Sequence, residues 1–211
     1  MNSEVNKKHE WRKAEKELYL PTTIPMLVQV PKQKFFTING KGDPTEEDFM
    51  QRIKVLFSVA YAVKMMPKNG FTPEGYFDYT VYPLEGVWDL TKEGKLLTIL
   101  NKDKLIYTLM IRQPDFVNKE VAEKALEIVQ KKKPHPLLAE IKFEEFEEGL
   151  CVQMLHNGSY DDEQKSFRIM REFIENNDLL RRAMSHREIY LNNLNAVEKD
   201  KLKTVLRWTV K

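Results

Sequence analysis

The chain has 211 residues and a formal net charge of +2, from 34 Lys and Arg against 32 Asp and Glu. This length suffices for one sizeable hydrophobic core, or for two half-domains that share one. The near-neutral charge argues against a dedicated nucleic-acid-binding protein, which normally carries a basic face. A single cysteine, Cys151, excludes an internal disulfide framework and a four-cysteine zinc site.

Two features bear on location. No apolar run approaches the ~20 residues that are needed to span a bilayer. Residues 1–12 are polar and lack the apolar stretch of a secretory signal. We therefore expect a soluble cytoplasmic protein with no membrane partner.

The first half of the chain predicts strands around one amphipathic helix. Aromatic and β-branched residues indicate the strands, and apolar residues at helical spacing indicate the helix. Pro83 to Gly86 interrupts one aromatic strand, which suggests a bulge. The strands are expected at 26–30 (an edge), 34–39, 76–90 and 105–112, and the helix at 43–63.

The second half repeats this layout after a connecting helix at 118–133. It predicts strands at 150–156, 187–192 and 203–210, with a helix at 162–176. The order strand, helix, strand, strand therefore occurs twice. Duplicated α+β halves with antiparallel strands usually pair into one body, and the cleft between them is a natural ligand site. We expect one domain over 1–211, with a first repeat at 33–116, a connecting helix and linker at 117–148, and a second repeat at 149–211.

Motifs for cofactors and metals are not found. The sequence has no phosphate-binding glycine loop, no dinucleotide fingerprint, no zinc-protease helix and no nucleophile elbow. The four histidines are scattered and show no metal-ligand spacing. We expect no metal and no cofactor, and we interpret Cys151 as a buried structural thiol.

Aromatic residues and carboxylates form the strongest candidate site. Glu188 and Tyr190 lie two apart on a short strand, so both side chains point to one face, and His186 shares that parity. If the face is exposed, Glu188 is an ordinary surface glutamate. If the face lines the cleft, its carboxylate meets the aromatic segment 76–90, a combination that suits planar or cationic ligands. Burial would then raise the pKa of Glu188 toward the range of a general acid or base.

The tyrosines of segment 76–90 have an equally good structural interpretation. Tyr79 and Tyr82 differ in parity, and either could simply pack a core. Trp88 shares parity with Tyr82, but the Pro83 interruption can shift that phase. The sequence leaves open which of these rings faces the cleft.

Three segments together resemble the GyrI-like small-molecule-binding family. They are YFDYTVYPLEGVWDL at 76–90, LHNGSYDDE at 155–163, and the ending from HREIYL at residue 186. The opening at 9–21 is similar to a stand-alone subgroup, so the resemblance covers Trp11 to Lys211. The family is similar to the effector-binding domains of AraC-type and BmrR-type regulators. The resemblance implies an α+β fold of two pseudo-symmetric strand-helix-strand-strand (SHS2) repeats, with antiparallel sheets around a central ligand cleft.

The resemblance also implies site residues. Glu188 occupies the motif position of an acidic residue at the centre of the cleft, and Trp88 matches its aromatic side. Some family members are described as hydrolases that open the cyclopropane of cyclopropanoid DNA alkylators. In that scheme Glu188 would activate a water molecule, and Tyr190 or another tyrosine of the pocket would orient it. The further ligand-binding candidates are Tyr61, Tyr79, Tyr82, Met154, His156 and Trp208.

Regulators in this superfamily carry an N-terminal helix-turn-helix, and no such three-helix reader fits before residue 35. We therefore expect a small-molecule ligand and no direct nucleic-acid binding. The alternative to a hydrolase is a non-catalytic protein that sequesters or senses drugs, or that interacts with gyrase.

Overall fold

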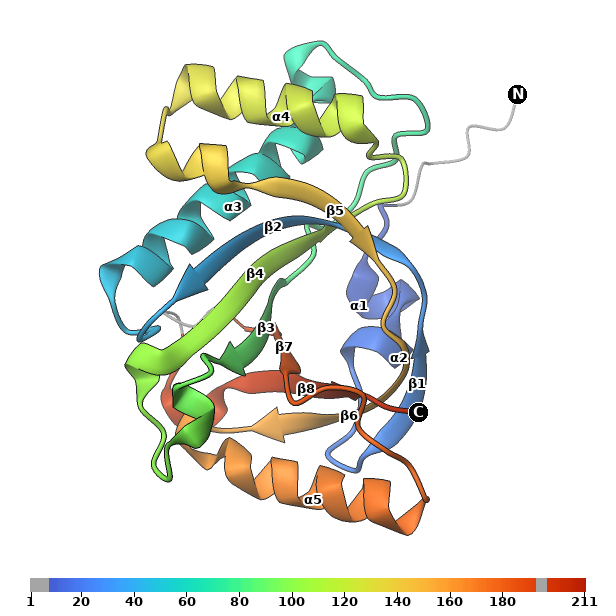
Figure 1. The fold of residues 1–211 in the computed structure, drawn as a ribbon. Coiled ribbons are helices and arrows are strands. Elements are labelled where there is room, and N and C mark those ends of the chain that lie inside the picture. The colour runs from blue at the N-terminus through green and yellow to red at the C-terminus, as the bar shows by residue number, and fades with distance from the viewer. Residues whose placement is uncertain (1–7, 193–196) are drawn as a thin grey trace, which may run out of the picture.

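The computed structural model describes residues 8–192 and 197–211 (Figure 1). Eight strands in these residues form one antiparallel sheet in the order β1-β6-β8-β7-β3-β4-β2-β5. The strands are β1 (Met26–Val30), β2 (Gln33–Lys41), β3 (Leu84–Leu90), β4 (Leu105–Gln113), β5 (Lys142–Phe146), β6 (Gly149–Asn157), β7 (His186–Tyr190) and β8 (Lys203–Thr209).

The helices lie on both faces of this curved sheet (Figure 1). The helix at 47–65 packs over β2 and β4 in the first half, and the helix at 163–176 packs over β6 in the second. Two one-turn helices lie on the inner face, between the two halves. The helices are α1 (Trp11–Ala14), α2 (Lys16–Tyr19), α3 (Glu47–Met65), α4 (Lys119–Lys132) and α5 (Glu163–Asn176). No helix in the described residues is long and apolar enough to cross a membrane.

The predicted α+β class with antiparallel strands is confirmed. The elements β2-α3-β3-β4 and β6-α5-β7-β8 follow the same order, and β3 pairs with β7 where the two halves meet. We expected a separate sheet in each half, but this pairing joins the strands of both halves into one continuous sheet. The edge strand expected at 26–30 is β1.

The strand predicted at 76–90 is shorter than expected. It begins at Leu84, and before it Tyr79 makes only an isolated bridge with His9. Pro83 has no N–H to donate to a ladder, so the regular pairing starts after it. The strand β5 was not predicted, because its alternating acidic and aromatic residues lie in what reads as a charged linker.

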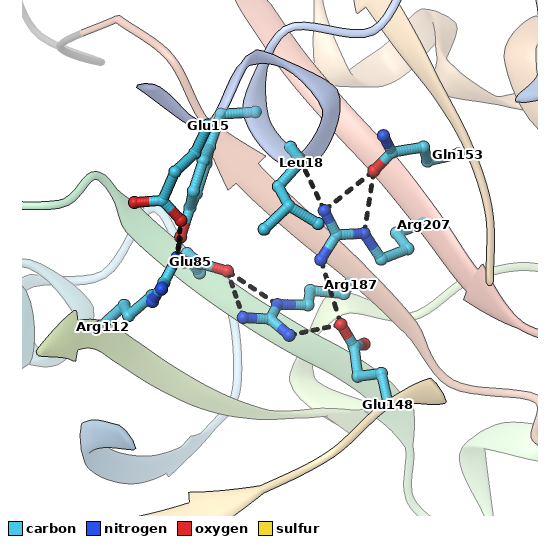
Figure 2. Close-up of polar contacts among 9 residues, drawn as sticks. Glu15, Leu18, Glu85, Arg112, Glu148, Gln153, Arg187 and Arg207 are labelled. Carbon is cyan, nitrogen blue, oxygen red and sulfur yellow. Dashed lines mark hydrogen bonds and ion pairs between the residues drawn. The ribbon is translucent and has the colours of Figure 1, made fainter. Parts of the chain in front are cut away.

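The inner face of the sheet carries a buried ionic network, defined here as Glu85, Glu148, Arg187 and Arg207 (Figure 2). Arg187 Nε donates to Glu85 at 2.7 Å, and Arg187 also contacts Glu148. Arg207 Nη1 lies 3.0 Å from the same Glu148 oxygen. Both arginine side chains are 2% exposed. Two guanidinium groups therefore depend on two carboxylates for their counter-charge.

The N-terminal segment, residues 9–20, packs on this network (Figure 2). Arg207 Nη2 donates to the carbonyl of Leu18 at 2.7 Å, and Glu15 pairs with Arg112. Trp11 and Tyr19 are buried. The segment is thus an integral part of the inner face, where the Leu18 carbonyl and the Glu15 carboxylate bind the largely buried Arg207 and Arg112.

We predict that Glu148→Gln destabilises the protein by about 3 kcal/mol at pH 7, because two buried guanidinium groups lose a shared counter-charge. Burial alone would raise the pKa of Glu148, but Arg187 and Arg207 outweigh it and hold that pKa below its usual value. Its contribution is therefore complete above about pH 4.3, the unfolded pKa, and is lost as the pH falls through the folded one. Urea denaturation between pH 7 and pH 2.5 measures both effects.

The control for this prediction is Glu172→Gln, which changes an exposed carboxylate on α5. It should leave stability within about 0.5 kcal/mol of the native protein. If Glu148→Gln behaves like this control at pH 7, the network contributes nothing net to folding.

Candidate functional site

A chain of hydrogen bonds crosses the two central strands on the other face of the sheet. Trp88 Nε1 donates to the Tyr190 hydroxyl at 2.8 Å, and that hydroxyl donates to Glu188 Oε2 at 2.8 Å. The second oxygen of Glu188, Oε1, lies 2.8 Å from His186 Nε2. Both oxygens of Glu188 are thereby held, so the orientation of the carboxylate is fixed.

The strand register explains this assembly. Residues 186, 188 and 190 alternate onto one face of β7. On β3, Gly86 lies opposite Glu188, and Trp88 lies opposite His186. A Cβ at Gly86 would lie 2.8 Å from Trp88 Nε1 and 3.3 Å from the Tyr190 hydroxyl. Gly86 thus leaves the room in which the tryptophan and the tyrosine meet.

A second carboxyl group, that of Glu163, completes the cluster. Glu163 is the first residue of α5 and is 7% exposed, and it hydrogen bonds with Glu188. Its Oε1 atom has no hydrogen-bond partner among the described residues. Sequence reasoning missed Glu163, because an acidic residue in a first helical turn is usually explained by the helix dipole and by solvent. The helical spacing does hold a signal, because Glu163 lies four residues before Phe167 and seven before Met170, on the buried face of α5.

Ionising both carboxyl groups would cost free energy, because two negative charges would then lie together in a buried site. Burial, followed by repulsion from Glu188 and Asp161, raises the pKa of Glu163 well above its usual range. Within the described parts of the chain, no lysine or arginine forms an ion pair with either glutamate, and the ion-pair partner of Glu188 is His186. The environment of Glu163 therefore favours its protonated form. Burial and the nearby Glu188 also raise the pKa of Tyr190, so its hydroxyl remains a hydrogen-bond donor.

The same groups define where a cation could bind. Glu163, His186 and Glu188 each offer one ligand atom, and these atoms lie within 4.8 Å of one another. Carboxylate and imidazole donors suit Zn²⁺ or Mn²⁺. However, both oxygens of Glu188 already accept hydrogen bonds. A proton on Glu163 satisfies the pair without any ion.

Aromatic rings from both halves surround the cluster. Phe49 and Tyr107 pack against Trp88, with ring centroids 5.8 Å and 4.9 Å away. Tyr160 meets Tyr190 edge-on at 6.1 Å, and Phe167 meets the ring of His186 edge-on at 4.9 Å. The carboxylates are thus enclosed by π-systems, which favour planar or cationic ligands.

A pocket of about 1050 Å³ opens beside this cluster. Val87 and Asp89, which flank Trp88, line it, as does Ser185, which precedes His186. His186 is the most open member of the cluster, with 24% of its side chain exposed. Five carboxylates line the pocket alongside apolar side chains: Asp43, Glu46, Asp48, Asp89 and Asp103. Lys41 and Arg52 line it too, and Asp48 and Asp89 are already paired with Arg52 and Lys95. Trp88, Glu188 and Tyr190 are not among the lining residues. The remaining excess of acidic side chains favours an amphipathic molecule that carries positive charge.

The structure brings together Glu188, Tyr190 and Trp88 as the sequence suggested. Trp208 stacks on Phe167, with ring centroids 5.3 Å apart, and so supports the ring that contacts His186. Met154 on β6 and Glu188 on β7 both pair with Leu206 of β8, so Met154 lies two strands away from Glu188, in the hydrophobic cluster under α5. Trp208 and Met154 thus belong to the packing next to the site.

The other candidates lie elsewhere. His156 Nδ1 is 2.9 Å from Ser166 Oγ on α5. Tyr82 donates to Glu15 of the N-terminal segment at 2.6 Å. Tyr79 packs against Phe116, and Tyr61 is 52% exposed on α3. The structure thus places these four residues outside the Glu188 cluster.

A model of one protein family matches residues 24–211. The chain belongs to the GyrI-like small-molecule-binding domain family. Two crystal structures described as hydrolases from Listeria innocua are 35% and 37% identical to it, with TM-scores of 0.88 and 0.89. Each comparison covers 97% of this chain and 100% of the other. No curated protein matches the sequence.

A more distant structure shares the GyrI-like fold. The C-terminal domain of EcmrR is 15% identical, with a TM-score of 0.52, over 89% of this chain and 96% of that domain. At this identity the likeness concerns the fold alone. The resemblance inferred from the HREIYL ending and the Trp88 segment is confirmed by the family match.

We predict that Glu163→Gln is more stable than the native protein, and that this difference in the free energy of unfolding grows as the pH rises from 5 to 8. Above about pH 4.3 the unfolded chain releases the Glu163 proton while the folded protein keeps it, so native stability falls with pH. Glutamine keeps an N–H donor toward Glu188 and has no proton to release. The difference should grow by up to about 1.4 kcal/mol per pH unit in urea denaturation. A difference that stays flat over this range would show that Glu163 is ionised in the folded protein.

Proposed function

We propose that the protein binds planar or amphipathic compounds, including cationic ones, over the chain of Trp88, Tyr190 and Glu188, and that it hydrolyses cyclopropanoid DNA alkylators there. The observation that carries the proposal is the contact between the carboxyl groups of Glu163 and Glu188 inside an aromatic enclosure. Such a pair offers a base and an acid at one place. The relatives from Listeria innocua that are described as hydrolases support a reaction of this class.

The reaction follows from the chemistry of a cyclopropane conjugated to a carbonyl group. Glu188 removes a proton from a water molecule, and the water oxygen forms a bond to a ring carbon. The carbon–carbon bond of the cyclopropane breaks, and its electron pair moves through the conjugated system to the carbonyl oxygen. That oxygen takes the proton of Glu163. Proton transfer between the two carboxyl groups then restores the starting state, and the net change is the addition of water.

The geometry supports each role. A carboxylate can accept about four hydrogen bonds. Glu188 accepts from Tyr190 and His186 and contacts Glu163, which leaves one direction for water. Tyr190 and His186 act as positioning residues, because they hold the carboxylate without needing to touch the substrate. The ring of Trp88 is the stacking surface.

A non-catalytic role in sequestering or sensing the same compounds is the second candidate. Its support is the negative charge of Glu188, which no lysine or arginine of the described chain neutralises in an ion pair. An organic cation that stacks on the surrounding rings would supply that charge. This role needs the same site but no water beside Glu188.

We predict that Glu188→Gln lowers turnover of a cyclopropanoid alkylator by at least about 100-fold, the usual contribution of a general base. Mass spectrometry of the small molecule should show a product with one added water over many turnovers of the native protein. Glu172→Gln on the surface of α5 is the matched control and should be fully active. A chelator should leave the rate unchanged, because carboxyl groups carry the reaction.

Each alternative outcome decides against the hydrolase. Unchanged compound in a stoichiometric complex with the native protein would establish the sequestering role. Full activity of Glu188→Gln would remove Glu188 from the chemistry. Loss of activity with chelator, restored by Zn²⁺, would assign the three-ligand cluster to a metal.

We predict a split between two substitutions of Trp88. Trp88→Phe keeps a stacking ring but removes the donor to Tyr190, so it should lower kcat about tenfold with little change in ligand affinity. Trp88→Ala also removes the ring and should weaken binding of a planar ligand by roughly 1–3 kcal/mol. Calorimetric titration and steady-state kinetics separate the two effects. Equal affinity of both variants and the native protein would make Trp88 structural.

A further inference from the structure

The connection between β3 and β4, residues 91–104, carries a run of exposed large apolar side chains. Leu96 is 85% exposed and Ile99 81%, and Leu100 and Leu97 are 60% and 48% exposed. Figure 1 shows this connection extending beyond the ends of β3 and β4. Contiguous exposure of this kind usually marks an interaction site.

The base of the connection is closed by hydrogen bonds. The N–H of Thr91 donates to the carbonyl of Lys104 at 2.9 Å, and the N–H of Gly94 donates to the Thr91 hydroxyl at 3.1 Å. Asn101 accepts from the N–H of Asp103. These contacts hold the tip of the connection, Leu96–Leu100, away from the body of the protein. The tip contributes no side chain to the hydrophobic clusters of the described residues.

The charges beside the tip are mainly positive. Four lysines flank it against two acidic residues, Glu93 and Asp103. One lysine, Lys95, pairs with Asp89 at 2.7 Å. An apolar tip with lysines at its base matches the layers of a bilayer surface, where acyl chains lie beneath anionic headgroups. The four lysines are Lys92, Lys95, Lys102 and Lys104.

We propose that the tip Leu96–Leu100 inserts into the surface of an anionic phospholipid bilayer, with the flanking lysines against the headgroups. The absence of a bilayer-spanning run does not bear on this contact, because surface insertion needs only a short apolar segment. A second copy of the chain is the less favoured occupant. A stable dimer buries about 800 Å² on each partner, more than four side chains of a projecting loop provide.

Membrane docking would place the candidate site next to lipid. Asp103 and Ile106, at the base of the connection, line the pocket beside the Glu188 cluster. Amphipathic compounds concentrate in bilayers. If the proposed function holds, the docked protein therefore collects its ligand where the ligand is most abundant. The lipid contact itself rests on the loop alone.

The test is flotation of the purified 211-residue chain with vesicles of phosphatidylcholine containing one third phosphatidylglycerol. The double variant Leu96→Ser/Ile99→Ser should partition at least about tenfold less than the native protein. The matched control is Ile24→Ser, which changes a 70% exposed side chain before β1. It should partition like the native protein. All three proteins should unfold at the same temperature, because the changed side chains are exposed.

A second variant and a second kind of vesicle measure how much the lysine charges contribute to membrane binding. Lys92→Glu/Lys102→Glu should bind the anionic vesicles more weakly, and the native protein should bind pure phosphatidylcholine more weakly than the mixture. Equal flotation of the native protein and Leu96→Ser/Ile99→Ser would overturn the proposal, as would no flotation at all. A lipid-free dimer, seen by analytical ultracentrifugation and lost in that double variant, would assign the tip to a second copy instead.

Discussion

The pairing of β3 with β7 decides what each face of the sheet can do. With Gly86 opposite Glu188 and Val87 opposite Arg187, the register sends the glutamate to one face and the arginine to the other. A slip of one residue would exchange them, because side chains alternate along a strand. The two halves of the chain meet along this pair, so the candidate site and the ionic network both depend on it.

The two faces hold charge in different ways. On the inner face, Arg187 and Arg207 are matched by carboxylates and by the carbonyl group of Leu18 in the N-terminal segment. The opposite charges there lie in direct contact. On the other face, Glu188 and Glu163 lie together without a guanidinium or ammonium partner in the described residues. This imbalance is the feature that a proton, a cationic ligand or a reacting substrate can use.

Much of the site was predictable from spacing. The parity of residues 186, 188 and 190 placed three side chains on one face, and the family resemblance added Trp88. Parity cannot say which face is covered, because that depends on pairing with a strand about 100 residues away. The tyrosines of 76–83 do not reach the site, for a physical reason. The Tyr82 hydroxyl, for example, donates to Glu15 of the N-terminal segment, a contact that no local pattern reveals. Helical spacing puts Glu163 on the buried face of α5 with Phe167, but it cannot show that Glu188 lies opposite.

The chemistry proposed for this site depends on one proton shared by Glu163 and Glu188 at neutral pH. Infrared difference spectroscopy between the native protein and Glu163→Gln tests it directly, because a neutral carboxylic acid and a carboxylate absorb at different frequencies. At pH 7 the native protein should show the carbonyl stretch of one buried carboxylic acid, and Glu163→Gln should lack it. A difference spectrum that shows only the loss of a carboxylate would mean that Glu163 holds no proton in the folded protein.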